Sequence, residues 1–298
     1  MFDLKGFLEE NSIRYRENEP MRLHTSFRIG GDASLFIEPL SPSELALIVE
    51  KCCENKIEYF VLGNGSNLLV SDDGITKPVI HLGKGFDSIE MPDETTIVAK
   101  AGASLSALCK YALSKELTGL EFAYGIPGTV GGAAFMNAGA YGGEMKDVVY
   151  SCSHIDYRGN FGSLKEERLE FGYRRSAYSE NGFIITDVTF KLCKGHKDEI
   201  ESRMNELLQK RIDKQPLNYP SAGSVFKRPE GYFAGALIEQ SGLKGKTIGG
   251  AAVSKKHAGF IVNVGNATCS DVTALIEFCR DTVFEKFGVT LETEIKRI

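Results

Sequence analysis

Gly63-Asn64-Gly65-Ser66-Asn67 and Gly125-Ile126-Pro127-Gly128-Thr129-Val130-Gly131-Gly132 are the two stretches that decide the fold of this sequence. The first leaves the end of a short apolar run, and the second leads into Ala133-Ala134-Phe135-Met136. Glycine allows turns of positive φ and close approach of the backbone, so each loop can present several N–H groups to one anion. Two such loops indicate one extended ligand that is bound at two points, and a dinucleotide pyrophosphate fits that description.

The spacing of the first loop differs from the familiar phosphate-binding motifs. A Rossmann loop needs a third glycine where Leu68 stands, followed by an acidic ribose ligand at a distance where this sequence has none. A P-loop is excluded because Gly-Lys-Ser/Thr follows neither glycine run. Taken alone, the first loop is as well explained by a plain turn as by a ligand site. The pair favours a ligand site, because polar side chains flank it, namely Asn64, Ser66, Asn67 and Asn137.

Length and composition indicate a soluble enzyme of two domains. The 298 residues are too many for one simple core, and 42% hydrophobic with 25% charged residues is ordinary for a globular protein. A formal net charge of −5 argues against non-specific binding of nucleic acid. The apolar runs are too short to span a bilayer, and the start Met1-Phe2-Asp3-Leu4-Lys5 lacks the pattern of a signal peptide. We therefore expect a cytoplasmic protein without membrane insertion. The sequence does not reveal the oligomeric state, and a monomer is our expectation.

The cysteines and histidines argue against metal or disulfide chemistry. The seven cysteines are scattered, no Cys-x-x-Cys pair occurs, and the five histidines do not cluster with them. We expect free thiols in a reducing compartment and no metal site.

Hydrophobic periodicity predicts a first domain over residues 1–194. Ser41 is the predicted N-cap of one helix, with Pro42 at its first position and Glu44 completing a capping box. Predicted helices cover 2–11, 42–51, 104–115 and 133–136, and predicted strands cover 33–38, 59–62, 96–100, 148–157 and 183–192.

A second domain is predicted over residues 197–298. It begins with a charged amphipathic helix, Lys197–Lys214, that ends near Pro216. Ser270 is the predicted N-cap of the last helix, and Gly288 is its predicted end. Predicted helices here cover 233–241 and 271–287, and predicted strands cover 248–253, 260–263 and 289–295.

Five motifs in a fixed order resemble one known family. They are His24-Thr25-Ser26-Phe27-Arg28-Ile29-Gly30-Gly31, the two glycine loops (the second followed by Asn137-Ala138-Gly139-Ala140-Tyr141-Gly142), Tyr173-Arg174-Arg175-Ser176 and Ser221-Ala222-Gly223-Ser224-Val225-Phe226-Lys227. From about residue 20 onward the sequence closely resembles the UDP-N-acetylenolpyruvoylglucosamine reductases, in the shorter subclass without an inserted substrate-covering loop. The resemblance implies an α+β fold. Its parts are a two-lobed FAD-binding domain of the vanillyl-alcohol-oxidase (PCMH) type, roughly 1–80 and 81–194, and a smaller C-terminal α+β domain that binds substrate.

The resemblance also implies an activity. It predicts NADPH-dependent reduction of UDP-N-acetylglucosamine enolpyruvate to UDP-N-acetylmuramate through non-covalently bound FAD, in cytoplasmic synthesis of peptidoglycan precursors. Such a reduction needs hydride, which side chains do not supply, and then a cation and a proton donor for the enolate that results. The expected partners are small molecules, NADPH and the enolpyruvyl sugar nucleotide.

The resemblance assigns three catalytic residues. Arg174 matches the arginine that grips the substrate carboxylate, although the residues alone leave its neighbour Arg175 as an alternative. Ser224 matches the proton donor. Glu294 lies on the predicted last strand and matches the third residue, but a strand places Glu292 on the same face, so only the register of the family selects Glu294.

The resemblance assigns the FAD pyrophosphate to the two glycine loops. The expected cofactor-binding residues are Gly63, Asn64, Gly65, Ser66, Asn67, Ile126, Pro127, Gly128, Thr129, Gly131, Gly132, Asn137 and Tyr141. Weaker expectations for substrate contacts are Tyr124, Lys214, Lys227, Arg228 and His257. Taken singly, the last four are better explained as solvated surface residues, and Tyr124 is equally well explained as a core aromatic.

Two other functions remain open at this point. A flavoprotein oxidase of the same fold often tethers its flavin through a histidine, and neither glycine loop contains one. A non-catalytic nucleotide-binding module would leave Arg174, Ser224 and Glu294 without a common role.

Overall fold

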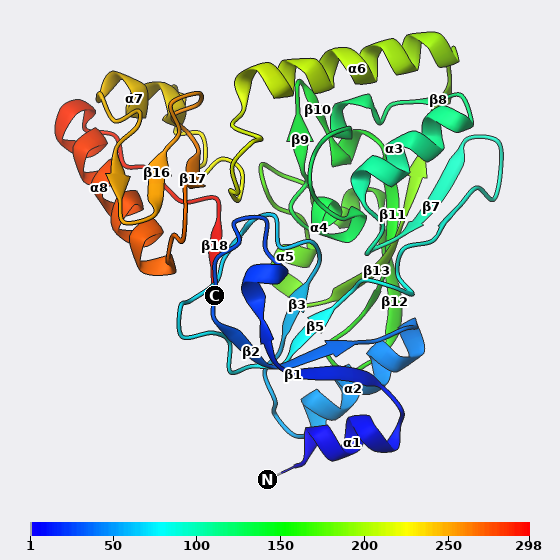
Figure 1. The fold of residues 1–298 in the computed structure, drawn as a ribbon. Helices are drawn as coiled ribbons and strands as arrows, with labels where there is room; N and C mark the ends of the chain where they lie inside the picture. Colours follow the sequence, from blue (N-terminus) through cyan, green and yellow to red (C-terminus); the bar gives the residue numbers. More distant parts are fainter. Residues whose placement is uncertain (1) are drawn as a thin grey trace. The chain divides into compact units, whose positions relative to one another are not determined.

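The computed structural model describes residues 2–298, and Figure 1 shows its ribbon. The chain divides into two compact units. The first unit consists of the residues up to Arg16, Leu35–Asn64 and Lys77–Lys210, and the second consists of Glu17–Ser34, Gly65–Thr76 and Arg211–Ile298. The division falls inside the long charged helix, and two early segments of the chain belong to the second unit.

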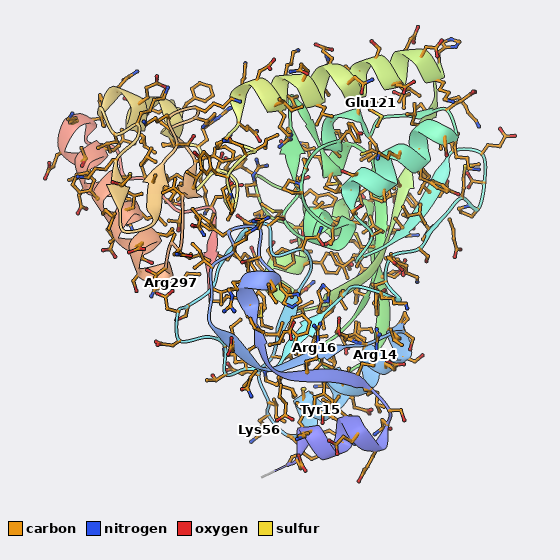
Figure 2. The ribbon with its side chains drawn as sticks, in the orientation of Figure 1. Arg14, Tyr15, Arg16, Lys56, Glu121 and Arg297 are labelled. Atoms are coloured by element: carbon orange, nitrogen blue, oxygen red, sulfur yellow. The ribbon has the colours of Figure 1, made fainter. Side chains whose placement is uncertain are left out.

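The N-terminal part of the first unit contains a sheet of order β1-β2-β5-β3, in which β5 pairs in parallel with both β2 and β3. Its elements are α1 (Leu4–Glu10), β1 (Arg14–Pro20), β2 (Asp32–Glu38), α2 (Pro42–Glu54), β3 (Phe60–Leu62) and β5 (Val79–His81). Figure 2 labels Arg16 on β1, whose guanidinium lies 3.0 Å from the Glu38 carboxylate and 4.9 Å from the Phe36 ring centroid. Both partners lie on β2, so these contacts stabilise the β1–β2 pair.

Helix α2 begins as predicted. Ser41 Oγ accepts a hydrogen bond from the Glu44 N–H, and Pro42 occupies the first turn. The predicted capping box is wrong in one respect, because the Glu44 carboxylate accepts the N–H of Leu40, one residue before the N-cap. The buried face of the helix is the stripe that periodicity predicts, namely Leu45, Ile48, Val49 and Cys52.

The larger sheet of the first unit has the order β12-β11-β13-β7-β6 and is antiparallel. Its strands are β6 (Ile89–Glu90), β7 (Thr96–Lys100), β11 (Val149–Ile155), β12 (Phe161–Lys165) and β13 (Ile184–Lys191). Three of these strands confirm the predictions for 96–100, 148–157 and 183–192. Periodicity does not predict β12, because four of its five residues are exposed and carry no alternating pattern.

Short elements complete the first unit. They are α3 (Leu105–Ser114), β8 (Leu117–Thr118), η2 (Glu121–Ala123), α4 (Val130–Phe135), β9 (Gly139–Ala140), β10 (Gly143–Glu144), η3 (Met145–Asp147), η4 (Glu166–Leu169), α5 (Tyr178–Asn181), β14 (Cys193–Lys194) and the first part of α6 (Lys197–Lys214). Helix α4 packs on β13 and β7 (Figure 1). It begins at Val130, inside the second glycine loop, rather than at Ala133 as predicted, because Thr129 caps it. One hydrophobic core runs through the unit from Leu4 to Met204.

The second unit has its own hydrophobic core and a small antiparallel sheet of order β15-β16-β17. Helices α7 and α8 pack against each other, α8 also contacts β15 and β16, and β4 pairs in parallel with β18. The elements are η1 (Met21–Leu23), β4 (Leu68–Leu69), α7 (Ala234–Gln240), β15 (Thr247–Ile248), β16 (Ala251–Val253), β17 (Ile261–Asn263), α8 (Cys269–Phe287) and β18 (Lys296–Arg297).

Three predictions for the second unit are wrong. The predicted strand over 248–253 is a hairpin of β15 and β16, because Gly249 has φ of +52° and turns the chain. Residues 289–295 form no continuous strand and contribute one isolated bridge, at Thr293. The N-cap of α8 is Thr268 rather than Ser270, because the Ser270 hydroxyl donates to Asp72 instead, at 3.0 Å.

Residues 2–298 contain no helix that could serve as a transmembrane span. Nor do these residues form any group of three or more His, Cys, Asp and Glu side chains that could hold a metal ion.

Candidate functional site

The two glycine loops meet in the first unit. Gly63 directly follows β3, and Thr129 is the N-cap residue of α4. A methyl group on Gly63 would lie 2.6 Å from Thr129 Oγ1, which is too close for any real side chain. Glycine is therefore required at position 63, because only a hydrogen on Cα fits against the second loop.

Part of the second loop serves packing. Val130 N–H donates to Ala103 O and Gly131 N–H donates to Ala101 O, each at 2.8 Å. A methyl group on Gly131 would lie 2.7 Å from Ala101 Cβ. Gly131 therefore allows α4 to lie close against the segment that follows β7, and its N–H is already used inside the protein.

Other N–H groups of the two loops have no such partner. Across residues 2–298, the N–H groups of Gly63, Asn64, Gly128 and Thr129 donate no hydrogen bond to the protein. Unused donors are uncommon in buried backbone, and of these four residues Thr129 is buried, Gly63 and Gly128 are half-buried and Asn64 is exposed. Donors from two adjoining loops can bind one anionic group. The residues of the first unit therefore fit the diphosphate of a dinucleotide such as FAD.

The rest of the first loop belongs to the second unit. Gly65 has φ of +56°, and a methyl group on it would lie 2.1 Å from His24 O, so only glycine fits there. Asn67 uses its side chain within the unit, since Nδ2 donates to Glu294 O at 3.2 Å. The carbonyl oxygen of Asn67 accepts the Lys296 N–H at 3.0 Å. Asn67 therefore holds the backbone on which Glu294 lies.

Asn137 is buried just after α4, with 1% of its surface exposed, and has φ of +44°. Its Nδ2 donates to Glu144 Oε2 and to Gly172 O, both at 2.9 Å, and its Oδ1 accepts the Lys146 N–H at 2.9 Å. The side-chain amide is thus fully occupied inside the protein. The other predicted cofactor and aromatic residues are less buried, with Ser66, Ile126 and Tyr124 half-buried and Pro127 and Tyr141 exposed.

Arg174 lies in a tight turn that begins at Gly172. The N–H of Gly172 donates to Arg175 O at 3.0 Å, and the N–H of Arg175 donates back to Gly172 O at 3.3 Å. Arg174 has φ of +55°, a conformation that side-chain-bearing residues seldom adopt. It is half-buried, and its guanidinium carbon lies 5.2 Å from the ring centroid of Tyr173. Arg175 is exposed and lies 3.6 Å from Glu180.

Ser224 and Glu294 lie on two segments of the second unit that are hydrogen-bonded to each other. Val225 accepts the Glu294 N–H at 2.7 Å, and its own N–H donates to Gly259 O at 2.9 Å. Ser224 and Glu294 are both half-buried. Glu292, in contrast, is exposed and its carboxylate lies 3.2 Å from Lys227 Nζ. Packing thus distinguishes the two glutamates that periodicity treats alike.

The residues predicted to contact substrate have mixed surroundings. Lys214 is exposed at the end of α6, and the guanidinium carbon of Arg228 lies 4.3 Å from the Phe233 ring centroid. His257 is half-buried, and its Nδ1 accepts the Gly259 N–H at 3.1 Å. Burial lowers the pKa of His257, so the ring is neutral and carries its proton on Nε2.

Sequence reasoning missed Glu144 and Ser176. The carboxylate of Glu144 lies 2.9 Å from Lys146 Nζ, and this ion pair, with contributions from Asn137 and the charge of Arg174, lowers its pKa. Ser176 is buried and its Oγ donates to Phe135 O at 2.7 Å. A signal for Ser176 existed, since it ends the Tyr-Arg-Arg-Ser motif, whereas nothing in the sequence marks Glu144.

Comparison with known proteins gives matches along the chain. Residues 33–163 match an FAD binding domain, and residues 215–298 match the C-terminal domain of UDP-N-acetylenolpyruvoylglucosamine reductase. The chain is 50% identical to the UDP-N-acetylenolpyruvoylglucosamine reductase of Clostridioides difficile (strain 630) over 99% of this chain and 96% of the relative. It is 51% identical to that of Caldanaerobacter subterraneus subsp. tengcongensis over 98% and 96%. The crystal structure of the Thermus caldophilus reductase is similar with a TM-score of 0.82 and 36% identity, over 96% of this chain and 98% of that chain.

Proposed function

The chain belongs to the UDP-N-acetylenolpyruvoylglucosamine reductase family, and we propose that Arg174, Ser224 and Glu294 carry out its chemistry. It is an FAD-dependent oxidoreductase that uses NADPH to reduce UDP-N-acetylglucosamine enolpyruvate to UDP-N-acetylmuramate, in peptidoglycan synthesis. Its fold is an FAD-binding domain of the PCMH type followed by the C-terminal domain of this family.

The contact between the glycine loops at Gly63 and Thr129, with unused N–H groups on both sides, is the observation that carries the assignment of the cofactor residues. When bound at these loops, FAD would supply the hydride-transfer chemistry between NADPH and the methylene carbon of the substrate, which side chains do not supply. The N–H groups of Gly63, Asn64, Gly128 and Thr129 are the proposed donors to its diphosphate. Gly131 contributes by packing, because its N–H is bonded to Ala101 O.

Arg174 is the proposed carboxylate-binding residue. Hydride addition leaves negative charge that is delocalised into the substrate carboxylate, and a guanidinium fork binds such a group in two places. Two features support Arg174 over Arg175: Arg174 is half-buried in a left-handed conformation, and Arg175 is exposed beside Glu180. A strained backbone at a candidate catalytic residue is typical of a functional site.

Ser224 is the proposed donor of the proton that the enolate carbon accepts. Glu294 is the proposed third residue, and it supports protonation from the segment that is hydrogen-bonded to Val225, next to Ser224. The ion pair of Lys227 with Glu292 leaves Glu294 as the better candidate of the two glutamates. Neutral His257, with its proton on Nε2, is a proposed hydrogen-bond donor to the sugar nucleotide.

Further parts of the proposal concern organisation and location. We assign residues 1–194 to FAD binding and 197–298 to substrate binding, and the two family matches lie inside these ranges. Tyr124, Lys214 and Lys227 are further candidates for substrate contact. A cytoplasmic monomer is the proposed form of the protein.

An anaerobic experiment tests the function. NADPH added to the purified, FAD-loaded protein should bleach the flavin absorbance, and UDP-N-acetylglucosamine enolpyruvate should restore it with formation of UDP-N-acetylmuramate. Denaturation should release free FAD, because attachment is non-covalent. The proposal would be contradicted if the enolpyruvyl substrate did not reverse the bleaching, or if the purified protein did not bind FAD.

A further inference from the structure

We propose that Asn137 is the positioning residue of Arg174, holding the turn that presents the guanidinium to the substrate carboxylate. This inference rests on the proposed function of Arg174 and assigns Asn137 a role other than the flavin contact that the sequence suggests. Asn137, Arg174 and the residues that connect them all lie in the first unit.

Asn137 is the polar centre of a buried junction. One Nδ2 hydrogen is donated to Gly172 O and the other to Glu144 Oε2, both at 2.9 Å. Its Oδ1 accepts the Lys146 N–H at the same distance. With 1% of the residue exposed, removal of the side chain would leave the Lys146 N–H without its partner, and Gly172 O and Glu144 Oε2 would each lose one of their two partners.

The bond to Gly172 is made at the first residue of the Arg174 turn. Gly172 O accepts from Asn137 Nδ2 and from the Arg175 N–H, so one carbonyl both closes the turn and anchors it. The left-handed φ of Arg174 is unfavourable for a non-glycine residue, so surrounding contacts have to maintain it. The other end of the turn is anchored as well, because Ser176 Oγ donates to Phe135 O.

The bond to Glu144 adds an electrostatic component. The charges of the Glu144 carboxylate and the Arg174 guanidinium interact, and Glu144 stays ionised because Lys146, and then Asn137, lower its pKa. Asn137 fixes this carboxylate and the Arg174 turn with the same amide group. Loss of that amide should therefore alter both the direction and the electrostatic environment of the guanidinium.

The first test separates the two half-reactions in the FAD-loaded protein. Asn137→Ala should slow recovery of flavin absorbance by the enolpyruvyl substrate by about tenfold to a hundredfold, because small displacements of a catalytic group have effects of that size. Bleaching by NADPH should change by less than about twofold. Asn160→Ala is the matched control, because Asn160 Nδ2 also donates to a carboxylate, that of Asp156, but in an exposed turn. It should leave both half-reactions unchanged.

The second test uses pH. In Asn137→Asp, the introduced carboxylate would face the Glu144 carboxylate and Gly172 O, with Lys146, Asp147 and Arg174 as the other charged groups around the junction. Below its pKa the introduced group gains a proton and one hydrogen bond to Glu144 or Gly172. The substrate half-reaction of Asn137→Asp should therefore recover toward the wild-type rate as pH falls. Asn137→Ala has no such group and should not recover.

The third test needs no activity. If Asn137 holds Arg174 in its strained conformation, Asn137→Ala should lower the Tm of the apoprotein by less when Arg174→Gly is also present. Glu116→Gly is the matched control background, because Glu116 has φ of +57° in another turn. In that background, Asn137→Ala should lower the Tm by as much as it does in the otherwise wild-type protein. This measurement decides the question even if Asn137→Ala does not retain FAD.

Equal slowing of both half-reactions by Asn137→Ala, no slowing, or full additivity of the Tm changes would overturn the positioning role. Arg174→Ala in the same assay tests the proposed function separately. If Arg174→Ala leaves the substrate half-reaction intact, the role of Arg174 fails. If it slows that half-reaction and Asn137→Ala does not, only the positioning role fails.

Discussion

Replacing Arg174 by glycine should abolish most of the activity while leaving stability nearly unchanged. Arg174 has φ of +55°, and a residue with a side chain loses about 1–2 kcal/mol in that region. Glycine removes this cost but raises the entropy of the unfolded chain, which costs about 0.5–1 kcal/mol. The lost cation–π contact with Tyr173 costs about another 0.5–1 kcal/mol. The terms nearly cancel, so the free energy of unfolding should change by less than about 1 kcal/mol.

Comparing alanine with glycine at position 174 measures the free-energy cost of the left-handed backbone separately from the loss of the guanidinium. It loses the same guanidinium contact and keeps the left-handed conformation, so it should be less stable than the glycine variant by about 1 kcal/mol. Both variants should slow the substrate half-reaction by about 100-fold to 1000-fold, the effect of removing one preorganised donor to a developing anion. Thermal unfolding and anaerobic stopped-flow absorbance measure the two quantities.

Arg175→Gly is the internal control. Arg175 has no left-handed φ to relieve and lies exposed beside Glu180, so glycine there should lower stability and leave activity intact. If Arg174→Gly is less stable than Arg174→Ala, the left-handed conformation stores no strain. The choice of Arg174 over Arg175 is wrong if Arg174→Gly reduces the substrate at the wild-type rate. It is also wrong if Arg175→Gly reduces the substrate more slowly than the wild-type protein.

Ser224→Ala should leave flavin bleaching by NADPH within about twofold and slow the substrate half-reaction by about 100-fold or more, as expected for a proton donor; equal loss in both steps would exclude that role. Glu294→Gln should reduce turnover strongly, whereas Glu292→Gln removes only an exposed ion pair and should change turnover little. If steady-state assays give the reverse order, Glu292 and not Glu294 is the third catalytic residue. Gly63→Ala places a methyl group 2.6 Å from the second loop, so retention of FAD after gel filtration should fall, and a fully loaded variant would refute the contact. Burial lowers the pKa of His154, so the unfolded chain binds more protons there, and stability should be lost as pH falls from about 7 through the unfolded value of about 6.5; His154→Phe should make this part of a plot of Tm against pH less steep, and the slope that remains includes the contribution of His257.

The sequence predicts a helix or strand well where the residues that determine it, such as its caps and its apolar positions, lie in one segment of the chain. Ser41 caps α2 as predicted, and α6 has the predicted bounds, because its apolar positions recur with a helical period and its ends lie near residues that stop a helix. The position of the first glycine loop after a short strand is also confirmed, although only Leu62 of that strand is buried. In each case the residues that determine the structure are neighbours in the chain.

Prediction fails where a residue from elsewhere in the sequence forms a hydrogen bond or ion pair with a group that would otherwise bond to its neighbours in the chain. Ser270 is a good N-cap in isolation, but the Asp72 carboxylate accepts its hydroxyl and its N–H, and Thr268 caps the helix instead. The paired alternatives Arg174 with Arg175, and Glu292 with Glu294, are equivalent by spacing. They differ in the structure because Glu180 and Lys227 lie next to one member of each pair.

Helix α4 gives a physical reason why the second glycine loop and the Tyr-Arg-Arg-Ser motif occur together. A helix of six residues is too short to be stable alone, so its position depends on packing against β13 and β7 and on the bonds from Val130 and Gly131 to the segment after β7. Its first end carries Thr129, which contacts Gly63. Its other end carries Phe135, whose carbonyl oxygen accepts the Ser176 hydroxyl at one end of the Arg174 turn. Just beyond lies Asn137, whose Nδ2 donates to Gly172 O at the other end of that turn. The glycines that allow α4 to pack closely therefore fix two things at once, the proposed diphosphate donors and the proposed carboxylate-binding arginine.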